Sequence, residues 1–207
     1  ELSLSYWYDI TRKDGIFVDV GAHTGIYSIV GNLNKKENNI ISIEPYFINF
    51  ARLLSNLKIN NIQTNNCILA AASSEKGFNK FNIKQNLSYH SSGGKLSEKG
   101  QFNVSTIKID DFKISKIIKG IKIDTEGHEL DVLKGATNII NKSKPDIIIE
   151  INQNCFDDCL AFLKPHGYRF YFFDEDKKQT INIEKFDNNF LGIVGSNCLA
   201  TIAKLNT

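Results

Sequence analysis

Apolar residues in this chain fall into two patterns that alternate along the sequence. Short, nearly continuous apolar runs are typical of strands buried on both faces, and they predict strands at 15–20, 39–44, 119–124 and 145–151. Further strands are expected within 60–73, near 78–83, and at 168–173 and 198–203. Between the runs, apolar residues recur at intervals of three and four, which predicts helices at 24–34, 46–58, 127–141 and 155–164.

Each predicted helix presents one apolar face to the core. The expected inward residues are Ile26, Ile29, Val30 and Leu33 in the first helix, Phe47, Phe50, Leu54 and Leu57 in the second, and Leu130, Leu133, Ala136 and Ile140 in the third. Strands that alternate with helices indicate a parallel sheet with right-handed crossovers. The last two strands are joined by turn-rich sequence without a helix, so we expect them to be antiparallel.

The chain is long enough for one substantial core and hardly long enough for two. No internal repeat or Pro/Gly-rich linker divides its 207 residues. We therefore predict a single α/β domain over 1–207, doubly wound around a mostly parallel sheet with a late antiparallel strand. The polar stretch 84–101 is its main insertion and the expected substrate loop.

Composition narrows the range of functions. The formal net charge is only +2, which gives no electrostatic basis for a long nucleic-acid track. No apolar run approaches the ~20 residues of a membrane span. The four cysteines lack the clustered partners of a metal site, so we expect reduced, mostly buried thiols and a cytoplasmic protein.

Polar residues gather where the predicted strands end. In doubly wound sheets, ligands bind beyond the carboxyl ends of the strands, near the point where the strand order reverses. Those ends carry Asp19, Glu44, Asp124, Glu126, Glu150 and Asn152. We expect these side chains to converge on one crevice.

The loop after the first strand separates two kinds of nucleoside ligand. It reads DVGAHTG over 19–25, with His23 where a dinucleotide-binding loop has its middle glycine. A pyrophosphate must lie against bare backbone, whereas S-adenosylmethionine carries no phosphate and leaves room for a side chain. Glu44 is placed to accept hydrogen bonds from the ribose diol of either ligand. The loop therefore favours S-adenosylmethionine over NAD.

The methionine part of S-adenosylmethionine carries a carboxylate, an ammonium and a sulfonium. We expect backbone N–H groups at the start of the following helix to receive the carboxylate, and an acid such as Asp19 or Asp124 to attract the cations. The predicted residues for this cofactor, and for its product S-adenosylhomocysteine, are Asp19, Gly21, Ala22, His23, Thr24, Gly25, Glu44, Pro45, Ala71 and Asp124.

Four stretches carry a resemblance to a known family. They are FVDVGAHTGIYS (17–28), IEP (43–45), IKIDTEGHELDVLKGA (121–136) and PDIIIEIN (145–152). Together they resemble the FkbM family of S-adenosylmethionine-dependent methyltransferases over roughly residues 15–152. The resemblance implies a Rossmann-like class I methyltransferase fold and O-methylation, often of sugars, glycolipids or specialised metabolites. Family members commonly have Asn where this chain has His23.

Methyl transfer to a hydroxyl is an in-line displacement that needs alignment and a nearby base. The candidate catalytic residues are Asp124, Glu126, Glu150 and His128, with His90 in the polar loop as a further candidate. Asp124 and Glu126 also fit a simpler role as caps of the helix expected from 127. We predict no metal ion, although Asp124, Glu150 and Asn152 offer the oxygen ligands that Mg²⁺ takes.

Other functions stay open. A NAD(P)-dependent oxidoreductase would share the fold, but the chain has no Tyr-x-x-x-Lys pair. A nucleic-acid amino-methyltransferase would have an Asn-Pro-Pro-aromatic motif where this chain has DTEG. A non-catalytic nucleoside-binding scaffold of the same fold would keep the binding residues. We expect a small-molecule or glycan acceptor and no nucleic acid, and we leave the oligomeric state open.

Overall fold

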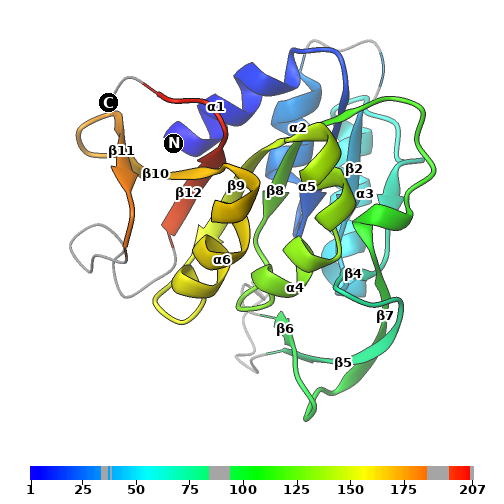
Figure 1. The fold of residues 1–207 in the computed structure, drawn as a ribbon. Coiled ribbons are helices and arrows are strands. Elements are labelled where there is room, and N and C mark those ends of the chain that lie inside the picture. The colour runs from blue at the N-terminus through cyan, green and yellow to red at the C-terminus, as the bar shows by residue number, and fades with distance from the viewer. Residues whose placement is uncertain (34–36, 38, 84–93, 186–195, 206–207) are drawn as a thin grey trace.

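The structure of the chain is a computed structural model, and it describes residues 1–33, 37, 39–83, 94–185 and 196–205. Among these residues, an eight-stranded sheet runs through the centre in the order β11-β10-β12-β9-β8-β1-β2-β3 (Figure 1). Its strands are β1 (Ile16–Val20), β2 (Ile40–Ile43), β3 (Cys67–Ile68), β8 (Ile118–Ile123), β9 (Asp146–Ile151), β10 (Arg169–Asp174), β11 (Gln179–Ile183) and β12 (Ser196–Thr201).

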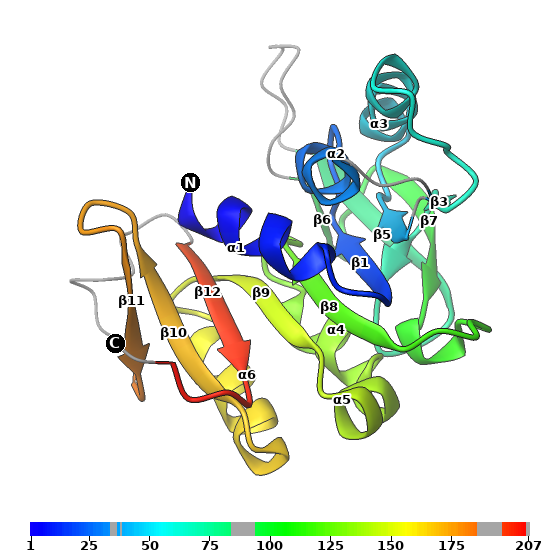
Figure 2. The same ribbon diagram turned by 90° about the horizontal axis from the view of Figure 1, so that it is seen from above.

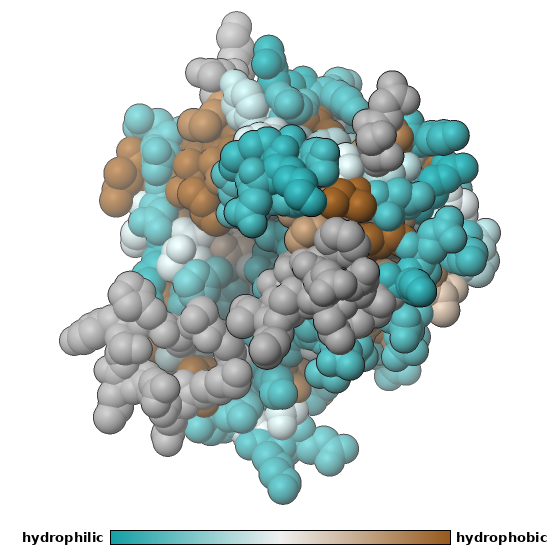
Figure 3. All heavy atoms as spheres, turned by 90° about the vertical axis from the view of Figure 1, so that its left-hand side faces the viewer, coloured by the Kyte–Doolittle hydropathy of each residue, from teal (hydrophilic) through white to brown (hydrophobic). Residues whose placement is uncertain are grey.

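The strand directions confirm the predicted sheet. β1 is parallel to β2 and β8, β8 is parallel to β9, and β2 is parallel to β3. The last two predicted strands, β10 and β12, are antiparallel to each other, as expected. The sequence prediction missed β11, which pairs with β10 at the edge of the sheet. Figure 3 shows this edge, where hydrophilic residues surround smaller groups of hydrophobic ones.

Helices cover both faces of the sheet, which confirms the doubly wound fold. Figure 2 shows α1 and α2 on one side and α4, α5 and α6 on the other. The helices are α1 (Leu2–Thr11), α2 (Ile26–Asn32), α3 (Phe47–Ile59), α4 (Glu129–Lys134), α5 (Thr137–Ser143) and α6 (Phe156–Leu163), with 3-10 turns at Ile109–Asp111 and Lys164–His166. The sequence prediction missed α1, whose buried Trp7 donates its indole N–H to the carbonyl of Tyr27 at 2.9 Å.

The predicted packing faces of the first two helices were partly wrong. Ile26 and Leu33 are 54% and 45% exposed, and Phe47 is 52% exposed. The buried residues of α2 are Tyr27, Ser28, Gly31 and Asn32. Its packing face is small and polar because neighbouring elements approach closely: a Cβ at Gly31 would lie 2.2 Å from Cδ1 of Ile40.

The helix predicted at 127–141 is two helices, α4 and α5. Gly135 lies between them so close to another segment that a Cβ there would lie 2.0 Å from the carbonyl oxygen of Ser73. The Asp110 carboxylate then accepts the backbone N–H groups of Asn138 and Ile139 at the start of α5. The break therefore comes from tertiary contacts, and the expected inward residues Leu133, Ala136 and Ile140 are fully buried.

A second, smaller sheet stands beside the first (Figure 1). Its order is β4-β7-β5-β6, formed by β4 (Ala71–Ala72), β5 (Gly77–Ile83), β6 (Gly94–Leu96) and β7 (Phe102–Ile107). β5 is the strand predicted near 78–83. Part of the predicted loop 84–101 forms β6, while 84–93, with His90, lie outside the described residues.

The four cysteines are free thiols, and Cys155, Cys159 and Cys198 are buried. In the part of the chain that the structure describes, no helix is both long enough and apolar enough to cross a membrane.

Candidate functional site

A cavity of about 250 Å³ lies at the carboxyl ends of β1, β2 and β8. The small sheet supplies another wall, through Phe81 and Ile83 of β5 and Gly94 and Leu96 of β6. The cavity therefore lies where the topology of a doubly wound sheet places its ligand, beside the point at which the strand order reverses around β1.

The loop after β1 owes its path to a glycine. Gly21 has a φ of +71°, and a Cβ on it would lie 1.8 Å from the carbonyl oxygen of Asp124. The N–H groups of Gly21 and Ala22 both donate to the carbonyl of Ile43, at 2.9 and 3.0 Å. The loop is thus held between the ends of β2 and β8, and only glycine fits at its closest approach.

Asp19 forms the floor of the cavity at the end of β1. Its Oδ2 accepts a hydrogen bond from the Ser28 hydroxyl at 2.6 Å. Its Oδ1 is buried and has no hydrogen-bond partner among the residues that the structure describes. Burial raises the pKa of Asp19 above its ordinary value. A buried acceptor without a partner is costly, so this atom fits a site that receives a donor or cation from a ligand.

Glu44 connects two segments at the end of β2. Its Oε2 accepts the backbone N–H of His23, and its Oε1 accepts the backbone N–H of Tyr46, both at 2.9 Å. Burial raises its pKa to about 7. A carboxylate has about four acceptor positions, so these bonds leave room for the hydroxyls of a ribose.

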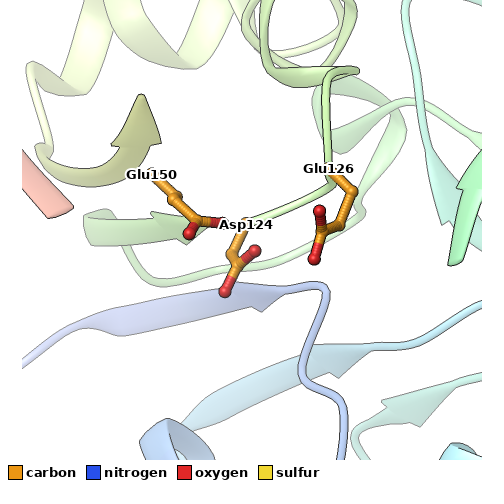
Figure 4. A group of neighbouring side chains, drawn as sticks. All are labelled: Asp124, Glu126 and Glu150. Atoms are coloured by element: carbon orange, nitrogen blue, oxygen red, sulfur yellow. The ribbon is translucent and has the colours of Figure 1, made fainter. Parts of the chain in front are cut away.

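Three acidic side chains meet at the ends of β8 and β9. The carboxylate oxygens of Asp124, Glu126 and Glu150 lie within 4.8 Å of one another and point toward a common centre (Figure 4). The predicted meeting of Asp124 and Glu150 at adjacent strand tips is confirmed. Asn152 fits the alternative Mg²⁺ site less well, because its Oδ1 already accepts the backbone N–H of Asn154.

A buried lysine neutralises part of this acidic cluster. Lys122 is 3% exposed, and its Nζ donates to Asp124 Oδ2 at 2.7 Å while lying 5.0 Å from the centre of the Tyr27 ring. Burial acts to raise the pKa of Asp124, but the Lys122 charge and a hydrogen bond with Glu150 outweigh it and lower that pKa. The same hydrogen bond, together with burial and the neighbouring charges, raises the pKa of Glu150 to about 9. These opposite shifts favour the proton of the pair on Glu150, which then donates to an ionised Asp124.

Glu129 orders the segment before α4. Its Oε1 accepts the Thr125 N–H at 3.1 Å, the Thr125 hydroxyl at 3.0 Å and the Gly127 N–H at 3.0 Å. The helix begins at 129, and no side chain caps it at position 128. In the described residues, these hydrogen bonds of the segment go to Glu129, so capping by Asp124 or Glu126 stays an untested alternative.

His128 is partly buried and lines the cavity. Its Nε2 lies 3.0 Å from the Ser73 hydroxyl, and its Nδ1 lies 3.4 Å from Oδ2 of Asp131. Burial lowers its pKa, although the charges of Asp131 and Glu129 act in the opposite direction.

The cavity brings most of the predicted site residues together. The lining residues among them are Asp19, Gly21, Ala22, His23, Glu44, Pro45, Ala71, Asp124, Glu126 and His128. Glu150 adjoins the lining through Asp124. Thr24 and Gly25 lie behind the wall: the Thr24 carbonyl accepts the amide of Asn56, and Gly25 precedes α2 in a left-handed conformation against Leu53.

Sequence reasoning missed three lining residues with distinct roles. Lys122 had a signal, because a charge inside an apolar strand two positions before Asp124 shares its side of the strand. Tyr46 and Phe81 stack with ring centroids 6.4 Å apart. This contact joins the start of α3 to the small sheet, so no local sequence pattern predicts it.

Comparisons with known proteins identify the family of the chain. The methyltransferase FkbM domain matches residues 19–170. The chain is 28% identical over 146 residues to the hexuronic acid methyltransferase AglP of Haloferax volcanii, which covers 68% of this chain and 57% of that protein.

Solved structures show the same fold. The methyltransferase FkbM of Methylobacillus flagellatus matches with a TM-score of 0.56 and 21% identity, and the match covers 90% of this chain and 43% of the Methylobacillus chain. A precorrin-6y C5,15-methyltransferase of Geobacter metallireducens has a TM-score of 0.54 and 14% identity, covering 97% and 86%. An rRNA methylase of Streptococcus thermophilus has a TM-score of 0.58 and 10% identity, covering 97% and 93%.

The fold is the Rossmann-like fold of class I methyltransferases. The chain belongs to the FkbM methyltransferase family, because the family domain covers most of its length. It spans about half the length of the first two relatives, AglP and the Methylobacillus protein.

Proposed function

We propose that the chain binds S-adenosylmethionine at the ends of β1, β2 and β8 and methylates a hydroxyl group of a sugar or related small molecule. The observation that carries the proposal is the pairing of the glycine loop with two buried carboxylates on one cavity wall, Asp19 and Glu44. Family membership supports the reaction class.

The residues fit the cofactor at two points. Glu44 has acceptor positions left for the ribose diol after it has fixed the loop. Asp19 keeps a buried oxygen without a partner among the described residues, which suits the ammonium of the methionine part. When bound, S-adenosylmethionine supplies an electrophilic methyl group on a positively charged sulfur.

The acidic cluster supplies charge on the side where the acceptor would enter. Ionised Asp124 attracts positive charge, and its position is fixed by Lys122 at 2.7 Å and by protonated Glu150. These contacts hold the carboxylate in place before any ligand arrives, so little reorganisation is needed during reaction.

Two observations favour a sugar acceptor. The Haloferax relative is a hexuronic acid methyltransferase, and the match covers 68% of this chain. In addition, Tyr46 and Phe81 line the cavity, while Phe47 and Phe102 pack on Tyr46 and are partly exposed. Aromatic faces of this kind suit the apolar side of a sugar ring.

A nucleic-acid acceptor lies outside this proposal. The likeness to an rRNA methylase concerns the fold alone, so the absence of nucleic acid among the acceptors stays a prediction. The cytoplasm also stays the proposed compartment, because free thiols suit a reducing environment.

The test uses S-adenosylmethionine with a labelled methyl group and two acceptors, D-glucuronic acid and total RNA. We expect label on the sugar as an O-methyl ether, identified by mass spectrometry, and none on RNA. Label on RNA would contradict the proposed acceptor class. Cofactor binding without transfer to any sugar, metabolite or RNA tested would favour a non-catalytic scaffold.

A further inference from the structure

A polar chain of side chains runs along the cavity wall next to the acidic cluster. Ser74 donates its hydroxyl to Oδ1 of Asp131 at 3.1 Å, and Oδ2 of the same carboxylate lies 3.4 Å from Nδ1 of His128. The other ring nitrogen, Nε2, lies 3.0 Å from the Ser73 hydroxyl. Within this series of side chains, His128 lines the cavity, so its ring reaches the space where an acceptor would bind.

The orientation of the ring follows from these partners. A carboxylate only accepts hydrogen bonds, so Asp131 favours the imidazole tautomer that carries its proton on Nδ1. That tautomer leaves a lone pair on Nε2, which the Ser73 hydroxyl can approach as a donor. Ser74 in turn fixes the carboxylate, because it occupies the oxygen that does not face the ring.

The neighbouring acids are less suited to accept a proton. Asp124 is ionised, but its pair with Lys122 makes it a weak base. The raised pKa of Glu150, about 9, favours its protonated form at neutral pH. A protonated carboxyl group cannot accept the proton of the acceptor hydroxyl. His128 lines the cavity, as Glu126 of the cluster also does, and its Nε2 carries a lone pair whose only hydrogen-bond partner among the described residues is the Ser73 hydroxyl.

We propose that His128 is the general base of the methyl transfer and that Asp131 is the positioning residue that orients it; this inference rests on the proposed function. The acceptor hydroxyl takes the place of Ser73 at Nε2. Its O–H bond breaks and the proton goes to Nε2, while an oxygen lone pair forms the new bond to the methyl carbon. The carbon–sulfur bond breaks and its electron pair stays on sulfur, which becomes a neutral thioether. The imidazolium is stabilised by the Asp131 charge until it releases the proton to solvent.

The surroundings of His128 set its response to pH. The charged groups that act on it are Asp131 and Glu129 of α4, and Ser73 contacts it from the segment after β4. Burial prevails over the two acids and keeps the ring neutral. Turnover should therefore fall only below the ordinary histidine pKa of ~6.5.

The first test needs no acceptor. Long-range ¹H–¹⁵N spectra of the histidine rings identify the tautomer, and the His128 signals are assigned by their loss in His128→Gln. We expect Nδ1–H at pH 7.5 in the wild type and a mixture of tautomers in Asp131→Ala. A ring protonated on Nε2 in the wild type, or a tautomer unchanged in Asp131→Ala, would overturn the proposal.

The second test measures turnover with D-glucuronic acid as the probe acceptor. His128→Gln should lower kcat by ~10²-fold or more with little change in S-adenosylhomocysteine affinity. Asp131→Ala should lower kcat and shift the acidic limb of the pH profile, and Asp131→Glu should restore part of the loss. The control Asp157→Ala removes an exposed first-turn acid from α6 and should change neither quantity.

The two hypotheses fail in different ways. If S-adenosylhomocysteine does not bind the wild type, the proposed function is wrong, whatever the tautomer. If it binds and turnover is normal in His128→Gln, the methyltransferase stands and His128 is not its base.

Discussion

The two sides of the cavity are stabilised in different ways. On the side of β1 and β2, the buried acids Asp19 and Glu44 are tied to hydroxyl and backbone groups, and Gly21 sets the path of the loop. On the side of β8 and β9, side chains act on one another through charge: Lys122 on Asp124, and Asp124 on Glu150. The first side has a shape that changes in backbone would destroy. The second has a charge distribution that single substitutions would alter while the shape persists.

The largest expected effect is on the first side. In Gly21→Val, the new Cβ would lie 1.8 Å from the carbonyl oxygen of Asp124. The backbone φ of +71° at this position is also one that valine avoids. We expect loss of S-adenosylhomocysteine binding in calorimetry and a clear drop in melting temperature. Gly77→Ala is the matched control, because a Cβ there meets only Thr106 at 3.9 Å. Normal binding by Gly21→Val would show that this loop does not form the cofactor site.

On the second side, Asp124→Asn keeps size and removes the charge. Methyl transfer should fall by ~10²-fold, since an oriented charge in the site is lost. The melting temperature should also fall, because the buried Lys122 ammonium loses its carboxylate partner. Glu150→Gln is the comparison within the same pair. Because Glu150 is protonated at neutral pH, a carboxamide can replace it as donor, and turnover should stay within a few-fold. Equal losses in both variants would contradict the proton assignment.

Lys122→Met tests the charge balance through stability. It removes the partner of Asp124 from a buried position and leaves the carboxylate next to the acids of the cluster. We expect the free energy of unfolding to fall by about 1–3 kcal/mol. The loss stays below that of a fully buried pair because the Asp124 side chain is 36% exposed. Denaturant titration at pH 7 measures it, and an unchanged midpoint would mean that the pair contributes nothing net.

The raised pKa of Glu44 predicts that ligand binding depends on pH. Ribose hydroxyls donate better to an ionised carboxylate, so S-adenosylhomocysteine affinity should rise as pH increases through about 7. Glu44→Ala should weaken binding by about 1–3 kcal/mol, and Glu44→Gln should bind with little dependence on pH. The folded state holds this proton more tightly than the unfolded chain does. The contribution of the Glu44 proton to folding stability is therefore present at acidic pH and declines as the pH rises from about 4.5 to about 7.

A pH-independent affinity for S-adenosylhomocysteine in the wild type would indicate that Glu44 has only a structural role.

The smallest expected effect is His23→Asn. His23 has a φ of +50°, and asparagine adopts this left-handed conformation readily. S-adenosylhomocysteine affinity should stay within a few-fold in calorimetry. A loss comparable with that of Gly21→Val would assign the imidazole a direct contact that the backbone geometry does not require.

The sequence predicted the central sheet well because its strands are buried on both faces and carry near-continuous apolar runs. Strand ends then located Asp19, Glu44, Asp124 and Glu150 together, since parallel strands end at one edge. The packing face of α2 was not predictable in the same way. Its buried residues include Ser28 and Gly31, which are chosen by contacts with β1, β2 and α1 rather than by hydrophobicity.

The rest of the site depends on contacts between distant segments. The small sheet joins short strands over residues 71–107, and it brings Phe81 against Tyr46. The pairing of Ser73 with His128 likewise spans 55 positions in the chain. Local propensity contains no information on such contacts, so the partners of His128 became visible only in three dimensions.

The most direct test of the account is a pair of calorimetric titrations of the wild-type chain at pH 7.5, one with S-adenosylhomocysteine and one with NAD. The account predicts saturable one-to-one binding of S-adenosylhomocysteine and no measurable heat from NAD, because the loop at 19–25 has His23 where a dinucleotide-binding loop has its middle glycine. Tight binding of NAD with none of S-adenosylhomocysteine would contradict it.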